Sequence, residues 1–292
     1  MDDLIHRFTF EGLAVRGALV QLGEVFSQTS EHANYPAEIQ HLLGQTLCVS
    51  ALMSSIIKYE GRMTVQLQGQ GPLRLLLAQS TNKFGLRGMA RFDAAEFAAV
   101  ANAPLAEMVG QGRTLINIQA DKQAKPWQGV IDTNYPDLAA MFEAYFKQSE
   151  QLATRLFLFA DNDRCAGLLL QQLPNENSDD PDGWERLTKL AETLKAEEAL
   201  QLNVPEILKR LYHEETLRVY EPQPAFFNCN GCGERVEAML RQVAREELDA
   251  LVADTGKVEV TCEFCAKQFS YDAVDLNALL AANAVGGSSS LQ

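Results

Sequence analysis

"GRMTVQLQGQGPLRLLL", residues 61–77, determines the fold class. In its first half Met63, Val65 and Leu67 alternate with polar residues, "GQGP" then turns the chain, and the apolar alternation resumes over Leu73–Leu77. An apolar residue at every second position puts one face of a strand in a core. Two such runs joined by a turn rich in glycine and proline predict an antiparallel hairpin.

Strand and helix signals continue on both sides of this hairpin. Apolar residues recur at helical spacing after "YPAE" at residues 35–38 and after "NYPD" at residues 134–137. "TRLFLFA" and "AGLLLQQLP" read as late buried strands, and Pro174 ends the second of them. Residues 1–174 are therefore predicted to form an α+β domain with a mainly antiparallel sheet and helices.

Residues 175–225 have the character of an acidic helical linker. The stretch opens with "NENSDDPDG", which has no large apolar side chain, and carries 12 acidic against 6 basic residues. Trp184, Leu187, Leu190 and Leu194 then recur at helical spacing, and a second helix is predicted to start at Asn203. Such short amphipathic helices need a neighbour for their apolar sides, so we expect them to lie across the N-terminal sheet as a removable cover.

The last unit, residues 226–282, is predicted to be a small zinc module. Cys229 and Cys232 lie in a loop that enters a helix, and Cys262 and Cys265 lie at the tip of a predicted hairpin. Four thiolates in two CxxC pairs are the typical ligands of tetrahedral zinc. A unit with so little core depends on its metal, so zinc and fold should be lost together. Residues 283–292 are predicted to be a flexible tail.

Three roles remain open for the four cysteines. A static zinc staple is the ordinary role of such a module. A redox switch is the second, because zinc holds its ligands as thiolates, the form that oxidants attack, and each oxidised sulfur has a partner within reach. The third, a thioredoxin-like dithiol, fits poorly because that motif belongs to a βαβ unit and leaves the second pair without a role.

Composition argues against several other classes. The net charge of −14 repels phosphate backbones, so nucleic-acid binding is not expected. The chain has no signal peptide at its start and no apolar run that could span a membrane, which predicts a cytoplasmic protein. No phosphate-binding glycine loop indicates nucleotide use, and no serine, histidine or acid constellation indicates catalysis. We therefore expect no catalytic residues and no enzymatic activity.

The two isolated cysteines and the histidines have simpler explanations. Cys48 lies in the apolar run "LLGQTLCVSALM" and is expected to be a buried core thiol. Packing also explains Cys165, with an accessory redox role as the alternative. His213 and the other histidines show no metal-binding spacing.

The chain resembles the redox-regulated 33 kDa chaperonin family, the bacterial heat-shock holdases. The resemblance covers nearly the whole chain and is carried by "FEGLAVRGALVQL" (10–22), the opening hairpin, "LRGMARF" (86–92), "YFKQSEQLATRLFL" (145–158), "LYHEETLRVYEPQ" (211–223) and the cysteine pairs before "FSYDAVDL" (269–276).

This resemblance implies a redox-regulated, ATP-independent chaperone. The reduced form would be an inactive monomer with one zinc ion bound by Cys229, Cys232, Cys262 and Cys265. Oxidation would form the disulfides Cys229–Cys232 and Cys262–Cys265, release zinc, unfold the module and linker, and expose apolar surface that binds unfolding client proteins. The oxidised form would dimerise. A constitutive interaction protein with a static zinc module is the alternative function.

The first cysteine pair departs from the family pattern. The family usually has CxC there, whereas this chain has Cys229, Asn230, Gly231 and Cys232. A disulfide across CxC is strained and one across CxxC closes more easily, so the redox set point is expected to differ.

Overall fold

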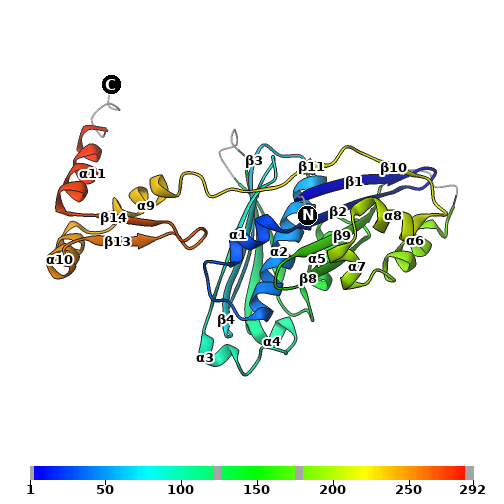
Figure 1. Cartoon of the computed structure of the whole chain (residues 1–292), viewed down its shortest axis with the longest axis horizontal. Helices are drawn as coiled ribbons and strands as arrows, with labels where there is room; N and C mark the ends of the chain where they lie inside the picture. Colours follow the sequence, from blue (N-terminus) through cyan, green and yellow to red (C-terminus); the bar gives the residue numbers. More distant parts are fainter. Residues whose placement is uncertain (1–2, 121–125, 175–179, 287–292) are drawn as a thin grey trace. The chain divides into compact units, whose positions relative to one another are not determined.

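The computed structural model describes residues 3–120, 126–174 and 180–286, with side chains up to residue 281. The chain divides into two compact units, residues 1–228 and 229–292. The predicted linker and the first three residues of the predicted zinc module thus lie in the first unit (Figure 1). In the described part of the chain, no helix combines the length and apolar character that crossing a membrane requires.

One sheet of the first unit joins the start of the chain to its late strands. Its strand order is β10-β1-β2-β9-β8, with β11 also paired to β1, and all its pairs are antiparallel. We call it the first sheet. The two late strands predicted from sequence are confirmed, and they meet the N-terminal strands through the pairing of β2 with β9. The strands are β1 (Leu4–Phe10), β2 (Val15–Leu22), β8 (Thr154–Ala160), β9 (Cys165–Gln172), β10 (Leu217–Val219) and β11 (Gln223–Pro224).

The opening hairpin lies at the centre of the second sheet. The strand order is β12-β5-β4-β3-β6-β7, and every pair is antiparallel except β12 with β5. The predicted hairpin is confirmed as β3 and β4. The α+β fold class with antiparallel sheets is confirmed as well. The strands are β3 (Gly61–Gly69), β4 (Leu73–Thr81), β5 (Gly85–Phe92), β6 (Gly112–Ala120), β7 (Trp127–Asp132) and β12 (Phe226–Phe227).

Strand β4 does not keep the simple alternation that its sequence suggests. The pairing of β4 with β5 shifts register between Leu73 and Leu75. A bulge of this kind moves the following side chains to the other face of the strand. Leu76 and Ala78 are therefore fully buried, whereas Leu77 is only partly buried.

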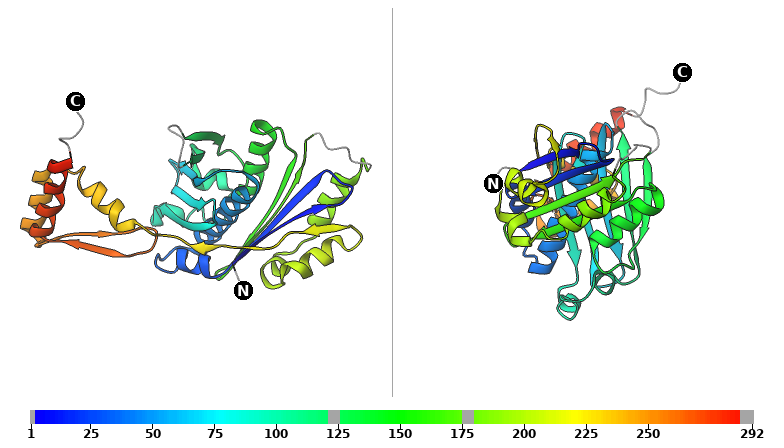
Figure 2. Two further views of the ribbon diagram at one scale, coloured as in Figure 1. Left: turned by 90° about the horizontal axis from the view of Figure 1, so that it is seen from above. Right: turned by 90° about the vertical axis from the view of Figure 1, so that its right-hand side faces the viewer.

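Helix α2 (Ala37–Ile56) forms the core of the first unit. It lies between the two sheets in Figure 2 and contacts strands of both. Because both sides are covered, twelve of its 20 residues are buried, including the polar Thr46, Ser50 and Ser54. The helix predicted after "YPAE" is confirmed, and it begins two residues earlier than that pattern implies, at Ala37. Glycines allow its close approach: a Cβ on Gly88 would lie 2.9 Å from a methyl carbon of Leu43.

The remaining helices of this core are short apart from α5. Helix α5 (Leu138–Ser149) begins after Asp137, whose side chain accepts a hydrogen bond from the N–H of Ala140 at 2.8 Å. This is the helix predicted after "NYPD". The others are α1 (Glu24–Ser30), α3 (Ala94–Phe97) and α4 (Leu105–Val109).

Three amphipathic helices cover the outer face of the first sheet. These cover helices are α6 (Gly183–Ala191), α7 (Ala196–Gln201) and α8 (Val204–Tyr212). Asn203 caps α8 as predicted, because its side chain accepts the N–H of Glu206 at 2.9 Å. Their apolar sides pack on what we call the cover face of the sheet, formed by Phe8, Phe10, Val15, Leu19, Ala166, Leu168 and Leu170. The predicted packing of this segment on the sheet is confirmed, but with three helices, because α7 was not predicted. Residues 175–179 of the predicted linker lie outside the described residues.

The second unit is small and has its own apolar cluster. It consists of α9 (Cys232–Leu240), α10 (Arg245–Thr255), β13 (Val258–Thr261), β14 (Gln268–Tyr271) and α11 (Ala273–Gly286). The predicted hairpin is confirmed as β13 and β14. Helix α10 ends at Gly256, which has the left-handed φ of 81°. Helix α11 was not predicted, and it includes residues 283–286 of the predicted tail. The rest of that tail lies outside the described residues.

Candidate metal centre

Two local structures bring the four predicted ligands together. Cys229 and Cys232 enclose Gly231, which has a φ of 70° and precedes the first turn of α9. L residues rarely adopt this conformation, so the glycine makes the two-residue spacing of the first pair feasible. Gly233 has a second role, because a Cβ there would lie 3.1 Å from the ring of Phe269.

The second pair lies in the tight turn between β13 and β14. The N–H of Cys262 donates to the carbonyl of Lys267 at 2.9 Å, and the N–H of Ala266 donates to the carbonyl of Cys262 at 2.8 Å. These bonds close the turn and orient Cys262 and Cys265 toward the same side, as the sequence predicted for the hairpin tip.

The four thiols form one cluster. All four Sγ atoms lie within 4.8 Å of one another. Cys229 Sγ is 3.7 Å from Cys262 Sγ, and Cys232 Sγ is 3.9 Å from Cys265 Sγ. Thiolates placed 2.3 Å from a tetrahedral zinc ion would be separated by about 3.8 Å. The donor set and its spacing therefore fit zinc, and the group could hold a metal ion.

The cluster is only partly shielded from solvent. Cys232 and Cys262 are buried, whereas Cys229 and Cys265 are half-buried. Burial tends to raise the pKa of Cys262, but the N–H of Phe264 and the neighbouring thiols outweigh it and lower that pKa below its ordinary value. Burial raises the pKa of Cys265 well above its ordinary value. The half-buried thiols of Cys229 and Cys265 are therefore in partial contact with solvent.

Sequence reasoning missed one residue of this centre, Arg235. Its Nη2 donates to Cys229 Sγ at 3.8 Å, and its Nη1 donates to the carbonyl of Asn230 at 3.0 Å. A guanidinium at this position stabilises the thiolate form of Cys229. The signal in the sequence is a single arginine three residues after Cys232, which is too common a pattern to stand out.

The two remaining cysteines lie elsewhere, in the core of the first unit. Cys48 and Cys165 are both fully buried, which confirms the core assignment of Cys48. Burial, followed by the adjacent Cys48 thiol, raises the pKa of Cys165. Such a thiol is protonated and inaccessible, so packing accounts for Cys165 in the folded unit.

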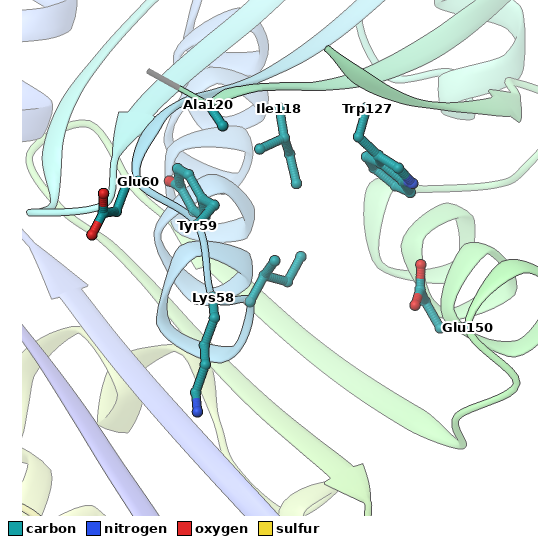
Figure 3. A pocket seen from close by; sticks show the side chains of 8 residues that line it. Lys58, Tyr59, Glu60, Ile118, Ala120, Trp127 and Glu150 are labelled. Atoms are coloured by element: carbon teal, nitrogen blue, oxygen red, sulfur yellow. The ribbon is translucent and has the colours of Figure 1, made fainter. Parts of the chain in front are cut away.

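A cavity of about 460 Å³ in the first unit holds charged side chains that do not converge. In Figure 3 Glu60 and Glu150 lie on opposite sides of it, with Tyr59 and Ile118 between them. Acid and base catalysis needs both groups within reach of one substrate atom. This cavity offers no such pair. Its lining consists of Ile57, Lys58, Tyr59, Glu60, Ile118, Ala120, Trp127 and Glu150.

Comparisons with known proteins agree on one family. Residues 3–272 match the family model described as Hsp33 protein. The 33 kDa chaperonin of Shewanella woodyi is 40% identical over 277 residues, which is 95% of each chain. That of Nitrosococcus oceani is also 40% identical, over 95% of this chain and 94% of its own. A crystal structure of the Thermotoga maritima 33 kDa chaperonin (heat shock protein 33 homolog) matches with a TM-score of 0.81 and 22% identity, covering 98% of this chain and 100% of that one.

Proposed function

This chain belongs to the Hsp33 family of chaperonins, and we propose that it is an ATP-independent holdase activated by oxidation. In the reduced, zinc-bound form the cover helices lie on the cover face and the protein is inactive. Oxidation of the four clustered cysteines unfolds the second unit and loosens the cover. The uncovered apolar face then binds unfolding client proteins and prevents their aggregation.

The observation that carries this proposal is the apolar surface between the cover helices and the first sheet. Leu187, Ile207, Leu208 and Tyr212 of the cover are at most 3% exposed. Tyr212 packs edge-on against the ring of Phe10, with ring centroids 5.0 Å apart. Removal of the cover would expose a contiguous apolar patch, and such patches bind other apolar chains.

The interactions that hold the cover on the sheet can also be reversed. Its outer side is charged: Arg186 pairs with Glu215 at 2.7 Å and Arg210 with Glu198 at 2.9 Å, both at the surface. Surface pairs contribute only about 0 to 1 kcal/mol each. Most of the stability of the cover therefore comes from apolar burial by three short helices, which local unfolding can reverse as a unit.

The second unit depends on its metal centre in this proposal. Among the side chains described up to residue 281, its apolar cluster has six buried members: Val236, Leu240, Leu248, Val258, Leu276 and Leu279. Zinc, when bound by Cys229, Cys232, Cys262 and Cys265, would hold the thiolates together and contribute an apparent binding free energy of roughly 10 to 16 kcal/mol. A unit with so small a core would not remain folded without it.

The redox step balances with peroxide as oxidant. Cys229 and Cys232 would lose two electrons and join as one disulfide, while one hydrogen peroxide molecule and two protons become two molecules of water. Cys262 and Cys265 would do the same with a second peroxide. Neither disulfide retains a thiolate for the metal, so completion of both oxidations leaves zinc without ligands and releases it.

Several further features belong to the same proposal. The reduced protein would be a monomer and the oxidised protein a homodimer, in the cytoplasm, with clients as its partners. Nucleotides, nucleic acids and membranes would take no part. The wider first pair, Cys229 to Cys232, would shift the oxidant dose at which the centre opens, because its disulfide closes with less strain than one across CxC.

The test combines zinc, thiols and chaperone activity in one sample. Peroxide with mild heat should release one zinc per chain, consume four thiols and let the protein suppress light scattering by a thermally unfolding client. The Cys48→Ala variant is the matched control, since Cys48 lies outside the cluster and alanine adds no buried hydroxyl, and it should respond like the original chain. Equal suppression before and after zinc loss would refute the switch. Peptide mapping that joined Cys229 to Cys262 would refute the proposed disulfide pairing.

A further inference from the structure

A second site lies at the end of helix α2, on the side of the first sheet. A cavity of about 270 Å³ opens there, and its lining combines two arginines with three hydroxyl groups. None of its lining residues is one of the four clustered cysteines. Its lining residues are Arg7, Phe8, Thr9, Arg16, Gly17, Ser55, Ile56 and Tyr220.

The cavity exists because α2 ends before the sheet does. Ala18 and its neighbours are buried under the helix, but the next row of paired residues lies beyond it. Directly paired residues of neighbouring strands project to the same face of a sheet. A polar row therefore crosses five strands here: Arg218, Thr9, Arg16, Gln171 and Thr154.

Arg16 is held in this row by a neutral partner. Its Nε and Nη2 donate to Gln171 Oε1 at 3.1 and 2.5 Å. Gln171 is fully buried and donates from Nε2 to Thr154 Oγ1 at 2.8 Å. This chain of bonds fixes the guanidinium of Arg16, which lines the cavity.

The positive charge of the row has no counterion in the described part of the chain. Arg7, Arg16 and Arg218 make no ion pair there, although the chain has 39 acidic residues against 25 basic ones. Burial lowers the pKa of Arg16, since desolvation disfavours its charged form. A half-buried cation beside a second cation is unfavourable until an anion joins them.

A purely structural role explains only part of this arrangement. Arg16 could serve merely to satisfy the buried Gln171. Arg7, however, is exposed, bonds to no side chain in the described structure, and still lines the same cavity one row away. Two guanidinium groups that share one cavity with the hydroxyl groups of Thr9 and Tyr220 match the several acceptor oxygens of a phosphate-type anion better than the two of a carboxylate.

We propose that this cavity binds a phosphate-class oxyanion between Arg7 and Arg16. The cavity is several times larger than the roughly 30 Å³ share of one water molecule, so it has room for more than one phosphoryl group.

The anion would also hold the end of the cover in place. Tyr220 follows strand β10, its N–H donates to the carbonyl of Arg7 at 2.9 Å, and its hydroxyl lies 3.5 Å from Thr9 Oγ1. A ligand that contacts both Arg16 and Tyr220 binds only while β10 is paired with β1. By linkage it stabilises the paired state. Its effect on chaperone activity, a higher threshold for activation, rests on the proposed function.

Isothermal titration of the reduced, zinc-loaded protein with inorganic phosphate and with pyrophosphate tests the site. We expect one site per chain, and a loss of affinity of about ten- to hundredfold in Arg16→Gln and in Arg7→Gln, since each removes a charge-assisted interaction. Arg62→Gln, a change of an exposed arginine on β3, is the matched control and should bind unchanged. Two results would overturn the site. Either neither anion binds at concentrations of about 10 mM, or Arg7→Gln binds the anion as tightly as the original chain does.

Hydrogen exchange of the same reduced protein tests the coupling without client or oxidant. Pyrophosphate should slow exchange of the Tyr220 amide in the original chain and leave it unchanged in Arg7→Gln. Binding without that protection would overturn the coupling. Because neither measurement involves oxidation or chaperone activity, a failure of the holdase proposal would leave both results standing.

Discussion

Replacing Leu208 by alanine should activate the protein without oxidant. Leu208 lies in α8, is 3% exposed and packs in the cluster that joins the cover helices to the cover face. Truncation of a buried leucine to alanine costs about 2 to 5 kcal/mol. Because the cover opens as a local unit, this loss of stability shifts the equilibrium between the closed and the open cover. Each 1.4 kcal/mol changes this equilibrium constant tenfold, so the fraction of molecules with an open cover rises about 30- to 4,000-fold.

The assay measures suppression of client aggregation by reduced, zinc-loaded Leu208→Ala protein. Free thiols and bound zinc are measured in the same sample, and both should equal those of the original chain. Lys209→Ala is the matched control, because Lys209 is the next residue of the same helix and is exposed. It should remain inactive until oxidised. Hydrogen exchange reports the opening of α6, α7 and α8 independently of any client.

Two results would refute the reasoning at different points. Unchanged exchange in the cover helices of Leu208→Ala would show that burial of this side chain does not hold the cover. Faster exchange with no gain in aggregation suppression would show that the cover face is not where clients bind. Zinc loss in the variant would mean that cover and metal centre are not separable by this change.

Three further predictions concern the metal centre. Cys262→Ser should bind clients without oxidant in the aggregation assay, because the weakened centre loosens the cover, whereas a static docking module would lose binding. Arg235→Gln should lower zinc affinity about tenfold in a chelator competition, since it removes the cation next to Cys229 Sγ; equal affinity would show that the contact has no influence. A zinc chelator under reducing conditions should abolish exchange protection in α9, α10 and α11 but not in α2, and a second unit that stays protected without zinc would contradict the small-core argument.

Local periodicity made much of the first unit predictable. The hairpin of residues 61–77, helix α2 and the cover helices each carry their pattern within about 20 consecutive residues, so neighbouring residues alone determine the element. The bulge in β4 was not predictable, because it depends on how Leu75 pairs with Arg91 in the next strand. Alternation in one strand contains no information about that partner.

Pairings between distant segments could not be predicted. Strand β2 pairs with β9, and β12 adds to β5 through Phe226 and Gly85 in the only parallel pair among the described strands. Short strands such as β12 have no periodicity to recognise. Their position depends on free sheet edges elsewhere in the fold.

The metal centre, too, was predictable only in part. The spacing of the four cysteines predicted their meeting, because CxxC pairs have few other uses in such a module, and the four thiols do come together. The contact of Arg235 with Cys229 depends on the turn at Gly231, which has a left-handed backbone. Sequence spacing does not give the direction of a side chain leaving such a turn.

The segment between the cover and the cysteines explains how the centre could control the cover. Residues 216–228 run along the edges of both sheets, through β10 and β11 on β1 and then β12 on β5. Each of these strands is at most three residues long, and the segment ends with the N–H of Asn228 donating to the carbonyl of Leu86 at 2.8 Å.

Short edge strands are marginally stable alone, so this segment stays paired because folded structure holds it at both ends. One end follows Tyr212 of α8, and the other is covalently joined to Cys229. On the proposed mechanism, unfolding of the second unit removes the restraint at Cys229. The two residue pairs between β12 and β5 lie nearest to that restraint and open first. Fraying then proceeds through β11 to β10, whose loss leaves α8 attached mainly by apolar burial. The cover is thereby weakened by a change at the cysteines that is transmitted through residues 216–228 alone.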